Sequence, residues 1–319
     1  MRDTLVLVNP RAGSGKAARV WEELRGQVPA ERVVVIDGGD ARGAAGKLDA
    51  ALAAPGIERL IALGGDGTVH LAANRLFATG RQGEVALGMV AAGTGSDLAT
   101  TLSLPREPRR ALEHALAAPP SPLDVVRITC GAERRVVLNV ASAGISGPVA
   151  ERVNRRVVRR ATVYVSATLA TLAEYRPFPV RVTVDGAPWY EGGVLLLAVA
   201  NGPRFGKGMR VAPEASVTDG LADVVLVPPM PAWKVPYRLP RLFTGTILQV
   251  PWVRWCRARR VAIEPLAPAP PYEVDGETIP SGAAELELLP GAVRFLLGPA
   301  APASPAGLFP PAQTPIVQK

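Results

Sequence analysis

The stretch Leu63-Gly-Gly-Asp-Gly-Thr68 lies between a predicted strand, Arg59–Leu63, and a predicted helix, Val69–Ala78. Its three glycines allow a ligand to approach the backbone closely. Asp66 can hold water, a hydroxyl or a metal-bound phosphate, and Thr68 can cap the helix and donate to a phosphate oxygen. This combination at a strand–turn–helix junction predicts a phosphate-binding loop.

Two further glycine-rich loops follow predicted strands. Asn9-Pro-Arg-Ala-Gly-Ser-Gly-Lys16 is not a Walker A loop, which would need glycine at Pro10 and Ser or Thr at Ala17, so it is a different phosphate loop or a tight turn. In Ala92-Gly-Thr-Gly-Ser-Asp97, the aspartate can cap a helix, hold a ribose, or both. Because all three loops follow strands, we expect them to gather at the carboxyl ends of a parallel sheet, where ligands bind.

The first 124 residues alternate strand and helix patterns, which predicts an α/β domain with a parallel sheet. The predicted strands are Thr4–Val8, Arg32–Ile36, Arg59–Leu63 and Ala86–Val90, and the predicted helices are Lys16–Val28, Ala41–Ala53, Val69–Ala78 and Pro108–Ala117. Pro119-Pro-Ser-Pro122 marks the end of this pattern. We therefore place an α/β domain over residues 1–124.

Residues 125–297 predict a mostly antiparallel β-sandwich or barrel. Its two predicted helical stretches are Gly147–Tyr175 and Ala232–Thr244. Its predicted strands are Val125–Thr129, Arg134–Val140, Val180–Val184, Gly193–Ala200, Ala222–Val227, Arg260–Pro265, Tyr272–Val274, Ala284–Leu289 and Val293–Leu297. Residues 298–319 are rich in proline and alanine without periodicity, which predicts a disordered tail.

Composition excludes several classes of protein. With 48% hydrophobic and 20% charged residues, the chain is globular rather than disordered. Two cysteines and two histidines are too few for a disulfide framework, a four-cysteine zinc site or a multi-histidine metal centre, and they fit a reducing cytosol. The longest apolar stretches are shorter than the roughly 18–20 residues that span a bilayer, so we expect a cytoplasmic protein.

The net charge of +8 is unevenly distributed along the chain. Residues 1–124 hold 14 basic and 14 acidic side chains, whereas residues 125–319 hold 22 and 14. This excess suggests an anionic partner for the second part, although a solvated basic surface without a partner is also consistent with it. No nucleic-acid-binding module is seen, and we expect no nucleic-acid partner.

Arginines gather at two places in the second part of the chain. One group precedes an apolar helical stretch, and four of its members share a helix face, which suits docking on an anionic membrane. A solvated face with internal acidic partners is the alternative. The first group is Arg152, Arg155, Arg156, Arg159 and Arg160, and the second is Arg254, Arg257, Arg259 and Arg260.

The three loops together resemble the diacylglycerol kinase catalytic-domain family, which includes bacterial soluble lipid kinases and is related to sphingosine and ceramide kinases. The resemblance extends over about residues 3–297 and includes four later motifs. These are the run from Asn201 to Val227, Phe243-Thr-Gly245, Arg257-Ala-Arg259 and Tyr272-Glu-Val-Asp-Gly-Glu277. The sequence departs from the family pattern at His70 and Ser96, where asparagine is usual, and at Lys207, where glycine is usual.

The resemblance implies specific roles for residues in both parts of the chain. Asp275 would be the general base, with Glu277 as a close rival. A structural Mg²⁺ would be bound by the Asp219 side chain and by backbone oxygens of Ser216 and Leu221, and Asp124 would link it to the active site through water. The residues that would bind ATP are Asn9, Pro10, Arg11, Ala12, Gly13, Gly64, Gly65, Asp66, Gly67, Thr68, Val69, His70 and Thr94.

The function implied is an Mg-dependent lipid kinase that transfers the γ-phosphoryl group of ATP to a lipid hydroxyl, diacylglycerol-like or sphingoid. Two alternatives stay open: a soluble-metabolite kinase of the NAD kinase type, and a non-catalytic nucleotide- or lipid-binding regulatory protein. We expect the active site in a cleft between the domains. We also expect peripheral contact with an anionic membrane and a possible homodimer through a sheet edge of the β domain.

Overall fold

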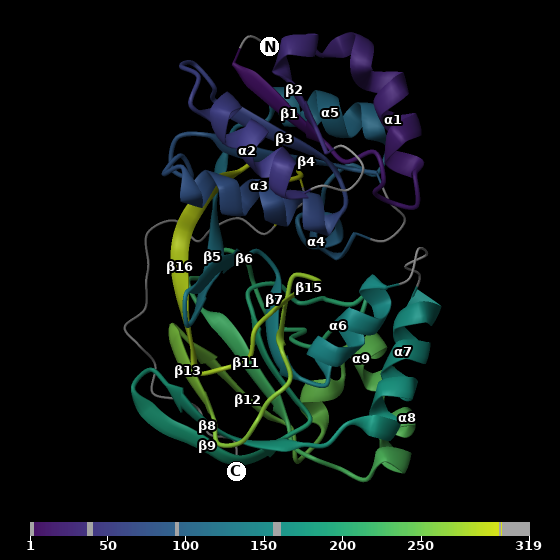
Figure 1. Ribbon diagram of the computed structural model, residues 1–319, viewed down its shortest axis with the longest axis vertical. Helices are drawn as coiled ribbons and strands as arrows, with labels where there is room; N and C mark the ends of the chain where they lie inside the picture. Colours follow the sequence, from purple (N-terminus) through teal and green to yellow (C-terminus); the bar gives the residue numbers. More distant parts are fainter. Residues whose placement is uncertain (1–2, 37–40, 93–95, 156–160, 300, 302–319) are drawn as a thin grey trace. The chain divides into compact units, whose positions relative to one another are not determined.

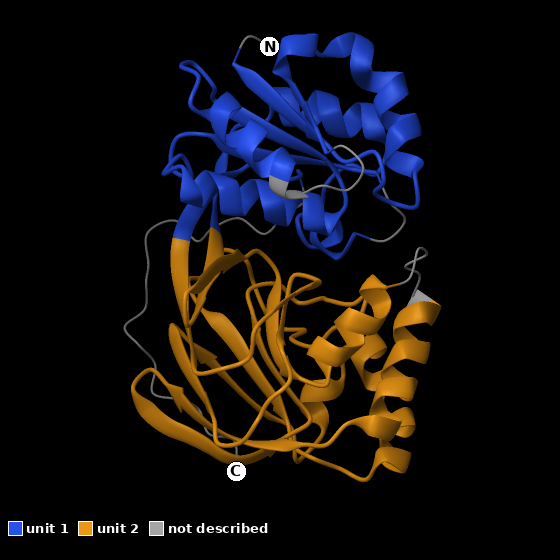
Figure 2. Cartoon of the chain, in the orientation of Figure 1, with its two compact units in different colours: residues 1–123, 291–303 blue, residues 124–290, 304–319 orange. Residues whose placement is uncertain are grey.

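The computed structural model describes residues 3–36, 41–92, 96–155, 161–299 and 301, and these form two compact units (Figure 2). Unit 1 contains the described residues of 1–123 and 291–303, and unit 2 contains residues 124–290. This division differs from the predicted 125–297 domain at its end, because Gly291 and the residues after it return to unit 1. Nearly all of the predicted tail, 298–319, lies outside the described residues.

The sheet of unit 1 is parallel, as predicted. Its strands run in the order β2-β1-β3-β4, with β1 at Thr4–Val8, β2 at Val33–Val35, β3 at Arg59–Gly64 and β4 at Ala86–Ala91. The end of β16 (Ala284–Phe295) continues this sheet, because Phe295 pairs in parallel with Leu87 of β4. Unit 1 is therefore completed by the end of a strand whose first part belongs to unit 2.

Helices cover both faces of this sheet (Figure 1). Buried residues of α1 (Lys16–Leu24) and α5 (Pro108–Ala117) share one core with strand residues such as Val6 and Ile61. On the other side, α2 (Ala41–Leu52) contacts α3 (Asp66–Ala78). Helix α3 begins three residues earlier than predicted, and the short α4 (Asp97–Thr101) was not predicted. The glycine-rich stretch at 64–68 therefore runs into the first turn of a helix.

Unit 2 is an antiparallel β-sandwich, as predicted. Its six-stranded sheet has the order β12-β11-β10-β7-β14-β15, and neighbouring strands in it are antiparallel. These strands are β7 (Val140–Gly144), β10 (Leu196–Ala200), β11 (Ala222–Val227), β12 (Arg254–Ala258), β14 (Tyr272–Val274) and β15 (Glu277–Ile279). The sequence patterns had not separated β7 or shown β12 and β15.

The second layer of the sandwich is formed by β5 (Ser121–Cys130), β6 (Glu133–Val137), β8 (Phe178–Val184), β9 (Ala187–Val194), β13 (Arg260–Pro265) and the first part of β16. Side chains of both layers share one buried core, which includes Val182, Leu197, Val224 and Leu286. Successive residues of β10 point to opposite faces, and both faces are covered. This explains why β10 is a continuous apolar run rather than an alternating one.

The helices of unit 2 lie over the other face of the six-stranded sheet (Figure 1). They are α6 (Ser146–Asn154), α7 (Ala161–Glu174), α8 (Val235–Arg238) and α9 (Pro240–Thr244), with 3₁₀ turns at Ala232–Lys234 and Ile247–Gln249. The predicted helix 232–244 is divided because Pro236 and Pro240 lack the N–H that an uninterrupted helix needs. Within the described ranges, no helix is both long and apolar enough to cross a bilayer.

Candidate active site

The first two glycine-rich loops and the start of the third meet at the carboxyl edge of the sheet in unit 1, as their sequence positions predicted. Neighbouring strand ends are joined by backbone hydrogen bonds. The Asn9 N–H donates to the Leu63 carbonyl (3.0 Å), and the Ala92 N–H donates to the Gly64 carbonyl (2.9 Å). The first residues of the three loops, which are about 30 to 55 residues apart in sequence, thus lie next to one another.

A side-chain hydrogen bond joins the first loop to the second. The amide of Asn9 donates to Oγ1 of Thr68 (3.2 Å), and Thr68 is buried. At Gly64, a Cβ atom would lie 2.3 Å from the same Thr68 oxygen. Glycine is therefore required at position 64 for packing, independently of any ligand.

Asp66 joins the second loop to the third. The Ser96 hydroxyl donates to its Oδ1, and the Asp97 N–H donates to its Oδ2 (3.2 Å). Ser96 also caps α4 by accepting a hydrogen bond from the Ala99 N–H (3.0 Å). The Asp66 carboxylate therefore holds the start of α4 in place. Thr94, which we predicted to contact the nucleotide, lies outside the described residues.

The space in front of α3 suits a phosphate group. A Cβ atom at Gly65 or Gly67 would meet nothing within 4 Å, and Gly67 is exposed. These residues begin a 13-residue helix, whose first-turn N–H groups and dipole favour an anion. In the first loop, Gly13 and Gly15 have φ values of 60° and 86°, a left-handed conformation that glycine adopts without strain.

Two of the predicted ATP-binding residues have side chains that are buried in unit 1. Val69 is fully buried, and His70 is 3% exposed. The imidazole Nε2 of His70 lies 3.2 Å from the side-chain amide of Asn74, one turn further along α3. A contact of Val69 or His70 with a nucleotide stays a prediction.

The predicted catalytic residues, Asp275 and Glu277, lie on a two-residue β-hairpin of unit 2. Val274 pairs with Glu277, so Asp275 and Gly276 form the turn. Both have positive φ values, 48° and 90°, as a type I′ turn requires. The Asp-Gly sequence thus sets the register of β14 and β15.

The Asp275 carboxylate accepts three backbone hydrogen bonds. Its Oδ2 accepts from the N–H of Leu138 (2.7 Å), and its Oδ1 accepts from those of Asn139 and Val140 (3.0 Å each). It therefore fixes the hairpin to the corner between β6 and β7. Glu277 differs, because its side chain is exposed and the described residues provide no hydrogen-bond or ion-pair partner for it.

The predicted magnesium residues lie on a turn before β11. Asp219 Oδ1 accepts a hydrogen bond from the Leu221 N–H (3.1 Å), and burial raises the pKa of Asp219. The buried Asp124 reaches the same turn, because its Oδ2 accepts from the Gly220 N–H (2.7 Å). Within the described residues, no cluster of three or more His, Cys, Asp or Glu side chains could hold a metal. A metal at Asp219 would therefore need backbone oxygens, such as those of Ser216 and Leu221.

A fully buried asparagine connects these features, and sequence reasoning had not assigned it a role. The Asn201 side-chain amide donates to the carbonyls of Asp124 (2.8 Å) and Leu138 (2.9 Å). It therefore links the segment that carries Asp124 to the segment that binds Asp275. Asn201 opens a motif that the sequence displays, but nothing local indicates which carbonyls it reaches.

Glu273 is a second residue whose role was missed. It is 6% exposed and accepts hydrogen bonds from the Ser142 hydroxyl and the Gly276 N–H, both at 2.6 Å. Of the three acidic residues in the motif 272–277, one is thus buried, one is bound by backbone amides and one is exposed.

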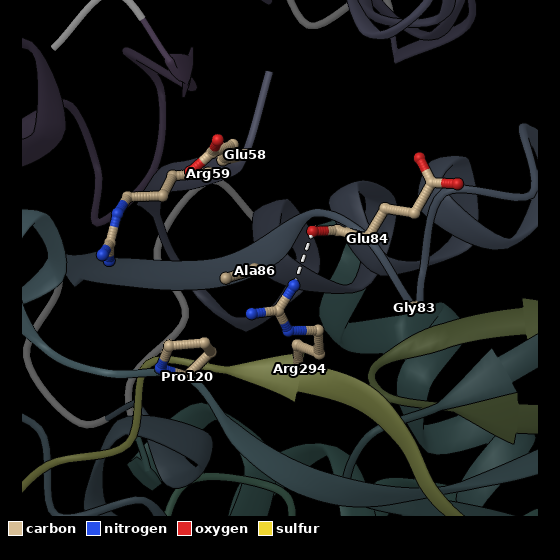
Figure 3. A pocket seen from close by; sticks show the side chains of 7 residues that line it. All are labelled: Glu58, Arg59, Gly83, Glu84, Ala86, Pro120 and Arg294. Atoms are coloured by element: carbon tan, nitrogen blue, oxygen red, sulfur yellow. Dashed lines mark hydrogen bonds between the residues drawn. The ribbon is translucent and has the colours of Figure 1, made fainter. Parts of the chain in front are cut away.

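A cavity of about 490 Å³ lies elsewhere in unit 1 (Figure 3). Arg59 and Ala86, which line it, are the first residues of β3 and β4, so it lies at the opposite strand ends from the glycine-rich loops. Its arginines have backbone partners. Arg59 donates to the Ala115 and Ala118 carbonyls, and Arg294 donates to the Glu84 carbonyl. This cavity is not part of the candidate site.

Two family models match the chain in sequence. "Diacylglycerol kinase catalytic domain" matches residues 3–128, and "YegS C-terminal NAD kinase beta sandwich-like domain" matches residues 139–297. The matched ranges together include the three loops, the Asp219 turn and the hairpin.

Comparison with individual proteins agrees with these matches. A diacylglycerol kinase from Mycobacterium tuberculosis is 30% identical over 91% of this chain and 93% of its own length. A probable YegS-like lipid kinase from Stenotrophomonas maltophilia is 28% identical over 92% and 95%. The fold is similar to the crystal structure of a putative diacylglycerol kinase from Bacillus anthracis, with a TM-score of 0.72, 22% identity and coverage of 94% and 96%. The chain therefore belongs to the diacylglycerol kinase catalytic-domain family of lipid kinases, which the sequence motifs had indicated.

Proposed function

We propose that this protein transfers the γ-phosphoryl group of ATP to the hydroxyl of a lipid, diacylglycerol-like or sphingoid, with Mg²⁺ as the metal. Family membership supports a lipid kinase that uses ATP. The hydrogen-bonded group of glycine-rich loops supports a phosphate site in unit 1. Phosphoryl transfer depends mainly on positioning and on neutralising charge, and such loops can provide the positioning.

The phosphates of ATP would lie against the first turn of α3 and the first loop. Gly65 and Gly67 leave space for a ligand, and the N-terminal N–H groups of α3 point toward it. Asn9 and Asp66 would act as positioning residues, because each fixes one neighbouring loop to the second loop.

The proton acceptor would come from the hairpin of unit 2. Glu277 is exposed, whereas both oxygens of Asp275 accept backbone hydrogen bonds. We therefore assign proton acceptance to Glu277 and assign to Asp275 the task of holding the hairpin in place. This reverses the preference for Asp275 that the family resemblance gave.

A magnesium ion fits the donor chemistry of the Asp219 turn. A carboxylate and backbone carbonyls are the hard oxygen ligands that Mg²⁺ prefers. Asp219 with the carbonyls of Ser216 and Leu221 would hold it, and Asp124 would keep the turn in place through the Gly220 N–H. When bound, the ion would add positive charge and stabilise this part of unit 2.

The observation that carries the proposal is the set of hydrogen bonds that joins the three loops around open space at Gly65 and Gly67. Its test is incubation of the protein with labelled ATP, Mg²⁺ and mixed micelles of diacylglycerol, sphingosine or ceramide, with NAD as a water-soluble acceptor. Label in a lipid is the expected result. Label in NAD alone would favour a soluble-metabolite kinase, and label in no acceptor would favour a non-catalytic protein.

A further inference from the structure

The segment between β11 and β12 exposes aromatic side chains in an unusual number. Six large apolar side chains are exposed among the described residues, and four of them lie between residues 233 and 252. They are Trp233, Tyr237, Phe243 and Trp252, with exposures of 66%, 77%, 40% and 41%. Such side chains belong at an interface that is apolar on one side and wet on the other.

The same segment is strongly basic. Residues 228–253 contain three basic side chains and no acidic one, a local charge of +3. These are Lys234, Arg238 and Arg241, which lie among the exposed aromatics, and the described residues offer them no carboxylate partner within 4.0 Å. These positive charges are available to an external anion.

The short helices place these side chains together. Trp233 and Tyr237 are four residues apart in a nearly continuous helical run, whose buried Val235 anchors it to the sheet. The Arg238 guanidinium lies 5.0 Å from the centre of the Trp252 ring, and Lys234 Nζ lies 5.2 Å from that of Trp233. The aromatic and basic groups thus form one surface, which we call the 233–252 surface.

We propose that the 233–252 surface docks unit 2 on an anionic lipid bilayer, with its aromatic rings at the level of the headgroups and its basic side chains on the lipid phosphates. This inference rests on the proposed lipid kinase function, because a bilayer is where such an enzyme finds its substrate. Tryptophan, tyrosine and basic residues are the side chains that peripheral helices use at membrane interfaces. Three basic side chains in a stretch that contains no acidic residue match an anionic surface.

Several of the arginines that the sequence had suggested for docking have partners within the chain. Arg152 forms an ion pair with Glu174, Arg260 pairs with Glu287, and Arg257 donates to the Glu214 carbonyl. The other members of the first group, apart from Arg155, lie outside the described residues. We therefore place the proposed membrane contact on the 233–252 surface rather than on those two groups.

The test is flotation of the full-length protein with vesicles, without ATP. We compare phosphatidylcholine vesicles with vesicles that contain phosphatidylglycerol in addition, at low and high salt. The charge variant Lys234→Gln/Arg238→Gln/Arg241→Gln should bind the anionic vesicles about 100-fold more weakly, from about fivefold per charge. The aromatic variant Trp233→Ala/Tyr237→Ala should also bind more weakly.

Two control variants change exposed residues outside the 233–252 surface. Leu266→Ala removes an apolar side chain elsewhere in unit 2, and Arg106→Gln removes a basic side chain of unit 1. Both should bind as the unchanged protein does.

Each outcome of the flotation experiment either supports or overturns the proposed docking surface. The docking surface would be overturned if vesicle binding did not depend on lipid charge and salt concentration. It would also be overturned if all variants bound as strongly as the unchanged protein. A third outcome would overturn it as well: if the unchanged protein is a dimer and the aromatic variant is a monomer, the surface joins two copies of the chain. Kinase activity on a short-chain diacylglycerol in solution is measured separately. A protein that floats but phosphorylates no lipid would refute the proposed function and leave the docking surface supported.

Discussion

Replacing Asp275 by asparagine should destabilise unit 2, because its carboxylate accepts three backbone hydrogen bonds at 2.7–3.0 Å. An asparagine side chain keeps one acceptor oxygen and turns an NH₂ donor toward at least one N–H group. Hydrogen bonds to charged groups contribute about 1.5–3 kcal/mol each, so the expected loss is about 2–4 kcal/mol of unfolding free energy. Asparagine tolerates the positive φ at this turn position, so the backbone adds little to the change.

Urea unfolding followed by tryptophan fluorescence measures this loss. Four of the five tryptophans, residues 189, 233, 252 and 255, lie in unit 2 and report on it. The matched control is Glu277→Gln, which changes an exposed carboxylate on the same hairpin and should stay within about 0.5 kcal/mol of the unchanged protein. If Asp275→Asn were as stable as that control, the anchoring role of Asp275 would be wrong.

The same two variants separate anchoring from proton acceptance. Glu277→Gln should lower kcat by about 10²–10⁴-fold, as expected for loss of a general base, while leaving stability intact. Asp275→Asn should lower activity together with stability, because the hairpin loses its anchor. Near-normal turnover of folded Glu277→Gln, combined with a large loss in folded Asp275→Asn, would return the base role to Asp275.

Three further outcomes are expected. Gly64→Ala should destabilise unit 1 by about 1–3 kcal/mol, because the new Cβ would lie 2.3 Å from Thr68 Oγ1. Gly67→Ala should keep its stability, because its Cβ would meet nothing within 4 Å, but it should raise the KM for ATP. Equal melting temperatures for the two variants would contradict this prediction. Millimolar Mg²⁺ should raise the melting temperature relative to EDTA, and Asp219→Asn should abolish that rise. Iodoacetamide should label Cys130 and Cys256 only after unfolding, because both side chains are 5% exposed. Burial also raises the pKa of both thiols, that of Cys256 to about 12, so little reactive thiolate is present. Rapid labelling of the native protein, detected by mass spectrometry, would disprove this prediction.

Much of unit 1 could be predicted because its signals are local. Apolar runs followed by glycine-rich loops define parallel strands, and the geometry of such a sheet then brings the loops to one edge. The sequence could not show that Asp66 binds the start of α4, because that contact joins residues 30 apart. It also could not show that His70 turns into the unit, since helix position alone leaves its direction open.

In unit 2, several signals were present but were not recognised. Asp275-Gly276 is a typical type I′ hairpin sequence, yet its place in a family motif drew attention to chemistry instead of to the turn. Strand β7 consists largely of small residues, and β12 is rich in arginine, so neither has a strong strand pattern. The links made by Asn201 connect segments more than 60 residues apart and are visible only in three dimensions.

The return of the chain to unit 1 has a consequence for biosynthesis. Phe295 pairs with Leu87, Leu296 lies in the core with α1 and α5, and the His114 ring contacts the Leu297 carbonyl at 2.7 Å. On the ribosome, the parallel sheet formed by β1 to β4 stays incomplete until the end of β16 has been synthesised, about 200 residues after β4. During that interval the edge of β4 and part of the core beneath it stand uncovered, so the nascent chain is exposed to aggregation there until translation has passed residue 297.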